Sequence, residues 1–327
     1  MVSEDIDITV AVCTYNRADR LVLALQSLQQ IQRPTGMGVE LLVVDNASTD
    51  DTAKVVQRMA KDSPVPMRLV HESQQGVAHA RNRALSSAPG RWVAFFDDDQ
   101  LADERWLVEL LAASNRRKCR CVGGAVRLRL PDDRPLAQAC RILLSETPAD
   151  MPESQYQGPR TPGAGNLLVD RRMALAAGGF DAQATMGGED TALYRALKAV
   201  GEPVWFTPLA IIEHVVPAER LQGAYLLWNA RRTGAHIADI ERHHFGRFGF
   251  AGWWLARIAQ ALCKAPRIGW RLRRGNDPVD RTGARCLAAA AGGYWRRSLH
   301  LLSGGWVSAD RYFQQLDFRS EREQFGS

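Results

Sequence analysis

Short apolar runs alternate with amphipathic stretches along the N-terminal third of the chain. Continuous runs of Val, Ile, Leu and Phe are typical of strands covered on both faces, and they occur at 8–13, 39–44, 67–70 and 92–96. The segments between them are expected to be helices, at 18–30, 51–60 and 76–87. Strands that alternate with helices predict an α/β fold, with a parallel sheet and right-handed crossover connections.

The alternation resumes after a stretch rich in proline. Residues 131–162 contain six prolines and little periodicity, which predicts a long irregular connection. The further elements expected are helices at 102–113, 171–177 and 189–197, and strands at 166–169, 204–207 and 210–212. Pro217 closes this pattern, so we expect a domain over 1–217 and a separate, mainly helical region over 218–327.

The net charge changes sign at the same boundary. Residues 1–217 hold 24 Lys and Arg against 27 Asp and Glu, a net −3, whereas residues 218–327 hold 18 against 9, a net +9. Six of the nine tryptophans also lie in the second segment. The C-terminal region is therefore basic and rich in tryptophan.

One expected helix contains several of these basic and tryptophan residues. A helix at 250–267, ending near Pro266, would carry Arg257, Lys264 and Arg267 on one face. Basic amphipathic helices with tryptophan are typical of peripheral membrane contact. The alternative is an ordinary helical subdomain whose tryptophans pack on the rest of the protein. Nucleic-acid binding is not expected, because no recognised module accompanies the arginines.

The cysteines and the first residues of the chain bear on the cellular compartment that we expect. The six cysteines show no regular spacing, so we expect reduced thiols rather than a zinc or disulfide framework. The acidic start runs directly into a strand and does not resemble a signal peptide. No apolar stretch approaches the roughly 18 residues of a spanning helix. We therefore expect a cytoplasmic protein that is peripheral on the cytoplasmic face of the membrane.

Three consecutive acids, Asp97, Asp98 and Asp99, follow the apolar run at 92–96. Open α/β sheets bind ligands at the carboxyl ends of their strands. Adjacent carboxylates repel one another and are desolvated by an apolar strand end, so a cation is needed there. A divalent metal that carries a phosphate fits this requirement. The alternative is an exposed acidic turn before a helix.

Polar side chains follow two other expected strands. Thr14, Tyr15, Asn16 and Arg17 come after the first, the segment 45–50 with Asp45 and Asn46 comes after the second, and Arg81 lies in the helix at 76–87. Simpler roles are open to each, since Asn, Ser, Thr and Asp cap helices and an arginine can be merely solvated. Together they place polar groups at one sheet edge, as a nucleotide pocket requires.

These segments resemble family 2 glycosyltransferases of the GT-A fold. The resemblance rests on four motifs in order, Thr-Tyr-Asn-Arg, Val-Val-Asp-Asn-Ala-Ser-Thr-Asp, Gly-Val-Ala-His-Ala-Arg-Asn and Phe-Phe-Asp-Asp-Asp, and it extends from about Ile8 to Pro217. It implies a Rossmann-like, mixed and mostly parallel sheet flanked by helices. It also implies a donor-binding half over about 1–100 and an acceptor half over about 101–217.

The resemblance assigns roles to individual residues. Residues 14–17 would line the nucleoside pocket, with Asp45 and Asn46 at the base and Arg81 nearby. Asp97 and Asp98 match the early part of the family's DXD motif, which meets the ribose and the metal, and Asp99 matches its last acid. The implied cofactor is Mn²⁺ or Mg²⁺ on the donor diphosphate. The sequence leaves open which of the three acids touches the metal.

A second acidic pair, Glu189 and Asp190, opens an expected helix. An acidic first turn that complements the helix dipole is the simpler interpretation. In the family this position supplies the general base, because an inverting transfer needs a carboxylate to accept the proton of the attacking hydroxyl. Asp190 is the candidate base, with Glu189 in support.

Two further positions are candidates. His214 follows a strand, where a histidine is often structural, but related enzymes place a metal-ligating or phosphate-contacting His there. Gly163, Gly165 and Asn166 precede a strand and could bring backbone close to the donor sugar or the acceptor, or could form a simple turn.

The expected activity is therefore inverting, metal-dependent glycosyl transfer. The donor would be a UDP-, GDP- or dTDP-sugar, and the acceptor a saccharide or lipid-linked intermediate in cell-surface polysaccharide assembly. The alternatives are a sugar-1-phosphate nucleotidyltransferase and a non-catalytic binding protein with the same fold. The nucleotidyltransferase would want a glycine-rich loop near Thr14, where Thr-Tyr-Asn-Arg stands instead.

Overall fold

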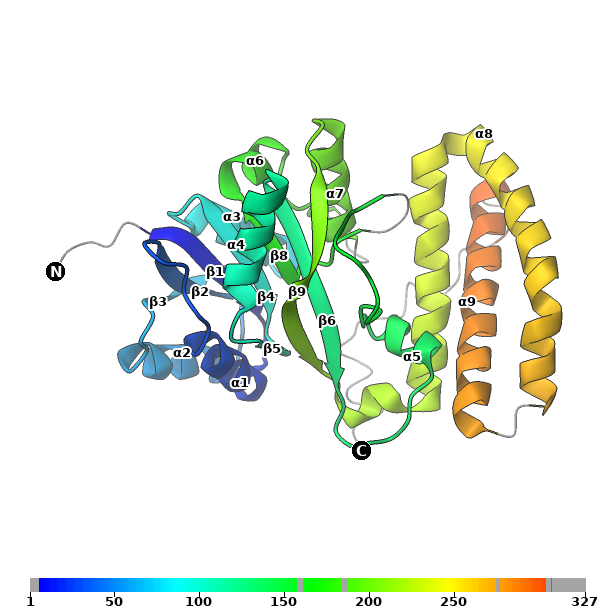
Figure 1. The fold of residues 1–327 in the computed structure, drawn as a ribbon, viewed down its shortest axis with the longest axis horizontal. Helices are drawn as coiled ribbons and strands as arrows, with labels where there is room; N and C mark the ends of the chain where they lie inside the picture. The colour runs from blue at the N-terminus through cyan, green and yellow to red at the C-terminus, as the bar shows by residue number, and fades with distance from the viewer. Residues whose placement is uncertain (1–5, 158–160, 184–187, 275–276, 304–306, 308–327) are drawn as a thin grey trace. The chain divides into compact units, whose positions relative to one another are not determined.

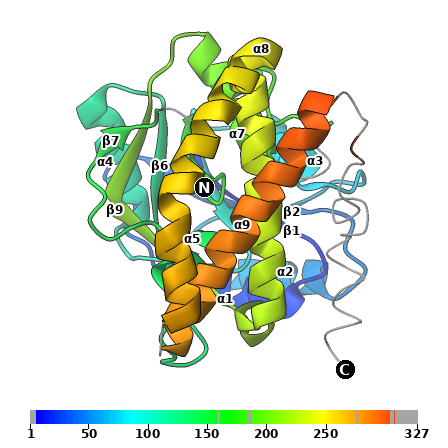
Figure 2. The ribbon, with the colours of Figure 1, turned by 90° about the vertical axis from the view of Figure 1, so that its right-hand side faces the viewer.

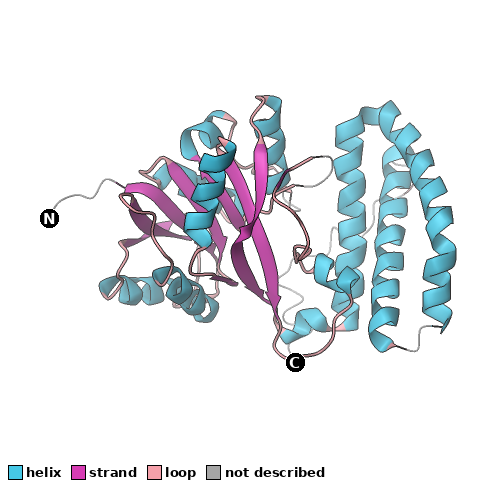
Figure 3. Ribbon diagram, viewed as in Figure 1, coloured by secondary structure: helices cyan, strands magenta, loops and turns pink. Residues whose placement is uncertain are grey.

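The computed structural model describes residues 6–157, 161–183, 188–274, 277–303 and 307. Within them, the side chains of 261–262, 264–265 and 267–274 are outside the description. The chain divides into two compact units. The sheet unit comprises Met1–Arg129 and Thr147–Val215, and the helical unit comprises Leu130–Glu146 and Val216–Ser327. Among the described residues, all strands lie in the sheet unit (Figure 3).

The sheet unit is built on a nine-stranded mixed sheet with strand order β3-β2-β1-β4-β8-β6-β9-β5, and β7 pairs with β9. Its strands are β1 (Ile6–Thr14), β2 (Gly38–Asp45), β3 (Met67–His71), β4 (Trp92–Asp97), β5 (Gln100–Ala102), β6 (Cys121–Arg129), β7 (Ser154–Gln155), β8 (Asn166–Asp170) and β9 (Val204–Val215). The first four strands along the chain run parallel, whereas β8 is antiparallel to both β4 and β6. This confirms the mixed, mostly parallel α/β sheet.

Helices cover both faces of this sheet (Figure 1). They are α1 (Ala18–Gln29), α2 (Thr52–Lys61), α3 (Val77–Ser87), α4 (Trp106–Arg117), α6 (Arg171–Ala176) and α7 (Glu189–Ala199). Alternate residues of each strand point to opposite faces, which gives two cores. Leu25 of α1 and Trp106 of α4 pack in one core with Val10. Leu85 of α3 and Leu193 of α7 pack in the other core.

Three expected elements differ from the structure. The helix expected at 102–113 begins at Trp106, because Gln100–Ala102 forms β5 and pairs with β9. The strands expected at 204–207 and 210–212 form the single strand β9. Its pairing with β6 shifts register between Gly123 and Ala125, opposite Pro208, and such an irregularity accommodates a residue that has no N–H to donate.

The connection expected at 131–162 is not irregular throughout, since it contains α5 (Gln138–Leu143) and β7. Its residues 131–146, together with Leu130, belong to the helical unit. There α5 lies against α9 (Pro278–Ser303), with the sulfurs of Cys140 and Cys286 3.7 Å apart.

The rest of the helical unit, where the structure describes it, contains a short 3-10 helix (Ala218–Leu221), the long helix α8 (Gly223–Arg274) and α9 (Figure 2). Helix α8 begins well before the expected residue 250 and continues through Pro266, which removes one helical hydrogen bond without ending the helix. Gly246, at φ 66° and ψ −177°, divides α8 into two segments. None of the helices in the described ranges has both the length and the apolar character to cross a bilayer.

Candidate active site

The carboxyl ends of β1, β2 and β4 meet at one edge of the sheet unit. The parallel register places Thr14 beside Asp45 and Cys13 beside Asp97. Residues that follow these strands therefore converge, as the sequence predicted for a ligand-binding edge. The candidate site is built from the loops that leave this edge.

The loops after β1 and β2 are joined by hydrogen bonds. Asn16 adopts a left-handed conformation with φ 48°, which Asn tolerates better than most residues. Its backbone N–H donates to the Ser48 hydroxyl at 3.0 Å, and its side-chain oxygen accepts from the Thr49 N–H at 2.7 Å. Asp45 accepts from the Ser48 N–H at 2.9 Å. These bonds hold the predicted nucleoside-pocket residues in one rigid edge.

Asn46 joins that edge to the loop before α3. Its amide donates to the carbonyls of Glu72 and Gln74 at 3.2 and 2.7 Å, and it accepts from the Gly76 N–H at 2.8 Å. In the same loop, the Gln75 amide donates to the Tyr15 hydroxyl at 3.3 Å. Asn46 is buried and engaged by backbone, so it shapes the pocket wall.

Asp98 is buried between the loop after β1 and the end of β4. The Thr14 hydroxyl donates to one of its oxygens at 2.7 Å, and the Arg17 guanidinium donates to the other at 2.6 Å. Burial raises the pKa of Asp98, although Arg17 opposes that shift. Asp98 therefore positions Arg17 at the site.

Asp99 and His214 form a second pair on the same side. An Asp99 oxygen lies 3.8 Å from the His214 Nε2 and 3.4 Å from the Arg17 Nη1. His214 is held there because β9 pairs with β5, opposite Gln100. No group of three His, Cys, Asp or Glu side chains suited to a metal converges within the described ranges. A carboxylate and an imidazole nevertheless fit a divalent ion that takes its remaining ligands from phosphate and water.

Arg81 lies at the centre of the site and is buried. Its guanidinium donates to Glu189 at 2.5 Å and to Asp97 at 3.2 Å, and it lies 5.6 Å from the centre of the Phe180 ring. Burial opposes the charged form, but the surrounding carboxylates dominate and raise the pKa of Arg81. One guanidinium therefore connects the end of β4 with the start of α7.

The acidic pair at the start of α7 is asymmetric. Glu189 is buried, and its second oxygen, Oε2, has no hydrogen-bond partner among the described residues. Burial raises the pKa of Glu189, against the opposing effect of Arg81. Asp190 is only partly buried, and one of its oxygens accepts from the Thr191 N–H at 2.7 Å. Asp190 is thus the more accessible carboxylate of the two.

Gly165 and Asn166 support the site from the start of β8. A Cβ on Gly165 would overlap the Asp97 carboxylate, whereas one on Gly163 would meet nothing within 4 Å. The Asn166 side chain accepts from the Trp106 indole at 2.8 Å and donates to the carbonyls of Ala125 and Ala210. Asn166 is therefore buried among structural partners, and its amide does not face the site edge.

Charge is unbalanced around the two arginines. The carboxylates that interact with Arg17 and Arg81 are those of Asp97, Asp98, Asp99, Glu189 and Asp190. Five negative charges against two positive ones leave a local excess of three. The arrangement favours a cationic ligand, or a metal that carries an anionic one.

Sequence reasoning missed two residues of this site. Cys13 lies beneath it, and burial raises the pKa of its thiol to about 12. Gln100 accepts from the Asp97 N–H at 3.2 Å and lies beside Gly165. The position of Gln100 directly after the three acids was the available signal, whereas Cys13 resembles any other strand residue.

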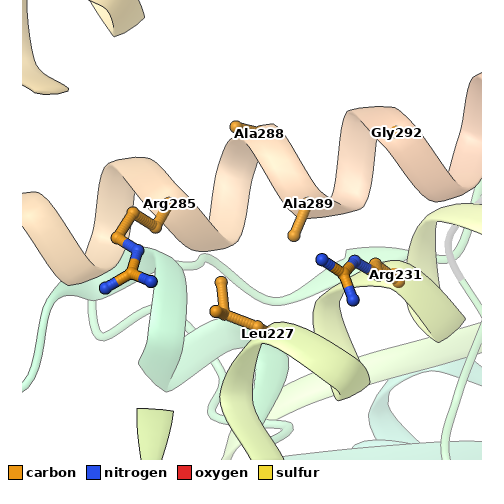
Figure 4. Close-up of a pocket in the computed structure, with 6 residues that line it drawn as sticks. All are labelled: Leu227, Arg231, Arg285, Ala288, Ala289 and Gly292. Carbon is orange, nitrogen blue, oxygen red and sulfur yellow. The ribbon is translucent and has the colours of Figure 1, made fainter. Parts of the chain in front are cut away.

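The helical unit has a groove of its own, of about 390 Å³, between α8 and α9 (Figure 4). Leu227 and Arg231 line it from α8, and Arg285, Ala288, Ala289 and Gly292 line it from α9. None of these lining residues has a carboxylate or an imidazole, so the groove offers contacts for binding and no acid–base group.

Comparison with known proteins identifies the family. Residues 9–167 match the sequence model of the family described as Glycosyl transferase family 2. The chain contains a family 2 glycosyltransferase domain. The match to this glycosyltransferase family spans the strand ends from Thr14 to Asp99, and it confirms the family expected from the four motifs.

Curated relatives of this glycosyltransferase include two long matches. The succinoglycan biosynthesis protein ExoM of Rhizobium meliloti is 27% identical over 237 residues, covering 71% of this chain and 73% of its own. TuaG of Bacillus subtilis, a putative teichuronic acid biosynthesis glycosyltransferase, is 24% identical over 79% of this chain and 96% of its own. Others match over less, such as 100 residues that make up 16% of an uncharacterized glycosyltransferase of Rickettsia felis.

A solved structure shares the fold of this glycosyltransferase. The mannosyltransferase PcManGT of Pyrobaculum calidifontis, in complex with GDP-Man and Mn²⁺, superposes with a TM-score of 0.60 at 22% identity. The superposition covers 90% of this chain and 88% of that one. The likeness confirms the GT-A-type fold.

Proposed function

We propose that this glycosyltransferase transfers a sugar from a nucleoside-diphosphate sugar to an acceptor hydroxyl with inversion at the anomeric carbon. The observation that carries the proposal is the position of Arg81 between Asp97 and Glu189. Through this guanidinium, the acid at the end of β4 and the acids that open α7 form one connected site. A donor diphosphate and an acceptor hydroxyl need those two groups close together.

The chain's own residues would divide the work. Residues 14–17 with Asp45 would bind the nucleoside, in the edge that the Asn16 and Ser48 contacts hold rigid. Arg17, fixed by Asp98, would contact the diphosphate. Asp190 would accept the proton of the attacking hydroxyl, because it is the accessible acid of its pair. Asp97 and Glu189 would hold Arg81 and orient the sugar.

A divalent cation fits beside Asp99. Asp99 and His214 would hold Mn²⁺ or Mg²⁺, and the excess negative charge of the site supports this. Bound there, the cation would offset charge on the leaving diphosphate. The Mn²⁺ and GDP-Man complex of PcManGT supports the same donor chemistry for this chain.

The acceptor is proposed from the relatives and from composition. ExoM and TuaG are named for polysaccharide biosynthesis, and they support a saccharide or lipid-linked acceptor in cell-surface polysaccharide assembly. The net +9 of residues 218–327 supports a peripheral position on the cytoplasmic face of the membrane. Within that region, Arg257 of the expected basic face pairs with Glu241, which offsets its charge. The side chains of Lys264 and Arg267, the other members of that face, lie outside the described residues.

The test separates donor binding from transfer. Asp190→Asn cannot accept the proton, so turnover should fall by roughly 10²-fold or more while donor affinity changes little. Asp99→Ala should instead abolish the thermal stabilisation that nucleoside diphosphate gives with Mn²⁺.

Near-normal turnover of Asp190→Asn would assign the base to another residue. Wild-type stabilisation that a chelator does not reduce would exclude the metal, and intact donor binding without any transfer or hydrolysis would favour the non-catalytic alternative.

A further inference from the structure

The turn between the two segments of α8, residues 243–249, is exposed and aromatic. We call it the α8 tip. Gly246 breaks the helix there with a left-handed φ of 66°. Gly249 packs closely on Phe245, since a Cβ on Gly249 would lie 3.2 Å from the Phe245 Cβ. The two glycines therefore allow the chain to turn closely past Phe245.

Two phenylalanines of the α8 tip face water. Phe248 is 88% exposed and Phe245 is 38% exposed, whereas Phe250, just beyond the tip, is fully buried. Phe245 packs on the Trp253 ring at 5.0 Å and on the His244 ring at 4.7 Å. Neighbouring aromatic side chains that are exposed together are typical of an interaction surface.

The residues at the α8 tip carry basic and no acidic side chains. Residues 242–249 contain Arg242 and Arg247 and no Asp or Glu. The acid just before this stretch, Glu241, is buried and is engaged by Arg257 and by the Tyr294 hydroxyl. Arg247, next to Phe248 in the tip, is exposed. Glu241 offsets the charge of Arg257, whereas the tip itself contributes Arg247 and no acid.

An anionic bilayer complements both properties. Its interface takes aromatic side chains at headgroup depth, and its surface potential attracts exposed arginines. A protein partner would have to supply an acidic and apolar pocket that matches the tip in shape, whereas a bilayer surface requires no such match.

We propose that the α8 tip inserts Phe245 and Phe248 into the surface of an anionic lipid bilayer. The proposal rests on the membrane contact given under the proposed function and assigns it to a defined element. It is independent of the transfer chemistry.

The test uses the full-length chain and vesicles of phosphatidylcholine with or without phosphatidylglycerol. Wild type should sediment with the anionic vesicles at low salt. Phe248→Ser should lower the partition coefficient about tenfold, since a phenylalanine loses its burial in lipid. Arg247→Gln should lower it about fivefold, and less so at high salt. Because both side chains are exposed, neither change should alter the melting temperature.

Two variants serve as matched controls. Val200→Ser removes a 67% exposed apolar side chain from the sheet unit, and Leu287→Ser removes a 44% exposed one from α9. Both should bind vesicles as wild type does. Equal binding by Phe248→Ser and wild type would overturn the proposal, and so would wild-type protein that ignores anionic vesicles or binds neutral ones equally well.

Two further measurements complete the test. The first shows whether the tip binds a bilayer or a second copy of the chain, and the second shows whether membrane binding and sugar transfer fail separately. If wild type is a dimer in the ultracentrifuge and Phe248→Ser is a monomer, the tip binds a second copy and the bilayer proposal is wrong. Transfer to a water-soluble acceptor should persist in Phe248→Ser. If the wild type shows no transfer at all yet binds vesicles through Phe248, the proposed function fails while this proposal stands.

Discussion

Gly165 has no side chain, and the Asp97 carboxylate stands where its Cβ would be. The glycine is not required for a left-handed backbone, because its φ is not among the positive values. What it provides is room. The position of Asp97, and with it the contact to Arg81, depends on that missing atom.

Gly165→Ala is therefore expected to displace Asp97. Overpacking of this kind costs about 1–3 kcal/mol, so the melting temperature should fall and nucleotide binding should weaken. Gly163→Ala is the control, two residues away and with open space around it. Thermal unfolding with and without nucleotide and Mn²⁺ checks both. Equal behaviour of the two variants would show that Asp97 can move without loss.

Glu189 should make stability depend on pH. Burial raises its folded-state pKa above the unfolded value of about 4.3. Its contribution to the free energy of unfolding is then fully present below that unfolded pKa, and it is lost as pH rises through the raised folded pKa. Glu189→Gln does not titrate. The melting temperature of wild type minus that of the variant should therefore decrease as pH rises from about 4 towards 7.

The comparison isolates the carboxyl of Glu189. The pKa of Asp98 is also raised, but Asp98 is present in both proteins and its effect cancels. Melting curves across that pH range in matched ionic strength supply the measurement. A difference that stays flat, or that grows with pH, would mean that the Arg81 contact outweighs burial for Glu189.

Among the elements, β8 is the strand that joins the parallel half of the sheet to the rest, between β4 and β6. Asn166 at its start is bonded to Trp106 of α4 and to Ala125 of β6. It also donates to Ala210 of β9. A single amide therefore ties β8 to three other elements behind the site.

Asn166→Leu should destabilise the sheet unit strongly. It leaves the Trp106 indole N–H and two carbonyls buried without this partner, at about 1–3 kcal/mol for each unsatisfied group. Asn115→Leu, at an exposed position of α4, should change the free energy of unfolding by no more than about 0.5 kcal/mol. Urea unfolding of both variants measures the difference. Similar urea midpoints for the two variants would contradict the role of Asn166 in joining these elements.

The elements also show what sequence patterns can predict. Strands β1, β2 and β4 are continuous apolar runs, so their type and order were evident. The site edge followed, because parallel strands end together. Strand β5 was missed since three residues carry no periodicity, and β9 was divided in two because Pro208 resembles a break. The role of Asn166 was beyond reach, because its partners are 41 to 60 residues away.

Considered whole, the chain leaves the sheet unit after Arg129 and returns to it at Thr147. The Thr147 N–H donates to the Val126 carbonyl at 2.9 Å, so the exit and return points lie close together. Composition predicted a basic, helical C-terminal region. It could not predict that residues 130–146 belong with it, because Cys140 and Cys286 meet across 146 residues of sequence.

Excision of the helical unit tests this division. Replacing 130–146 by a short Gly/Ser linker and ending the chain after Val215 should leave a soluble sheet unit that still binds nucleotide. Ending the chain after Val215 with 130–146 kept should aggregate, because the buried Cys140 and Leu144 would lose their cover from α9 and its neighbours. Solubility and melting temperature distinguish the two forms. An insoluble linker form would show that the sheet unit cannot fold alone.

The same connectivity has a consequence during synthesis on the ribosome. Residues 130–146 leave the exit tunnel long before α9 exists. At about 5–20 residues per second, the 146 residues between Cys140 and Cys286 take about 7–30 s to make. In that interval Cys140 and Leu144 lack the helix that later covers them. A nascent-chain chaperone should therefore bind at 130–146, and its release should coincide with the synthesis of α9.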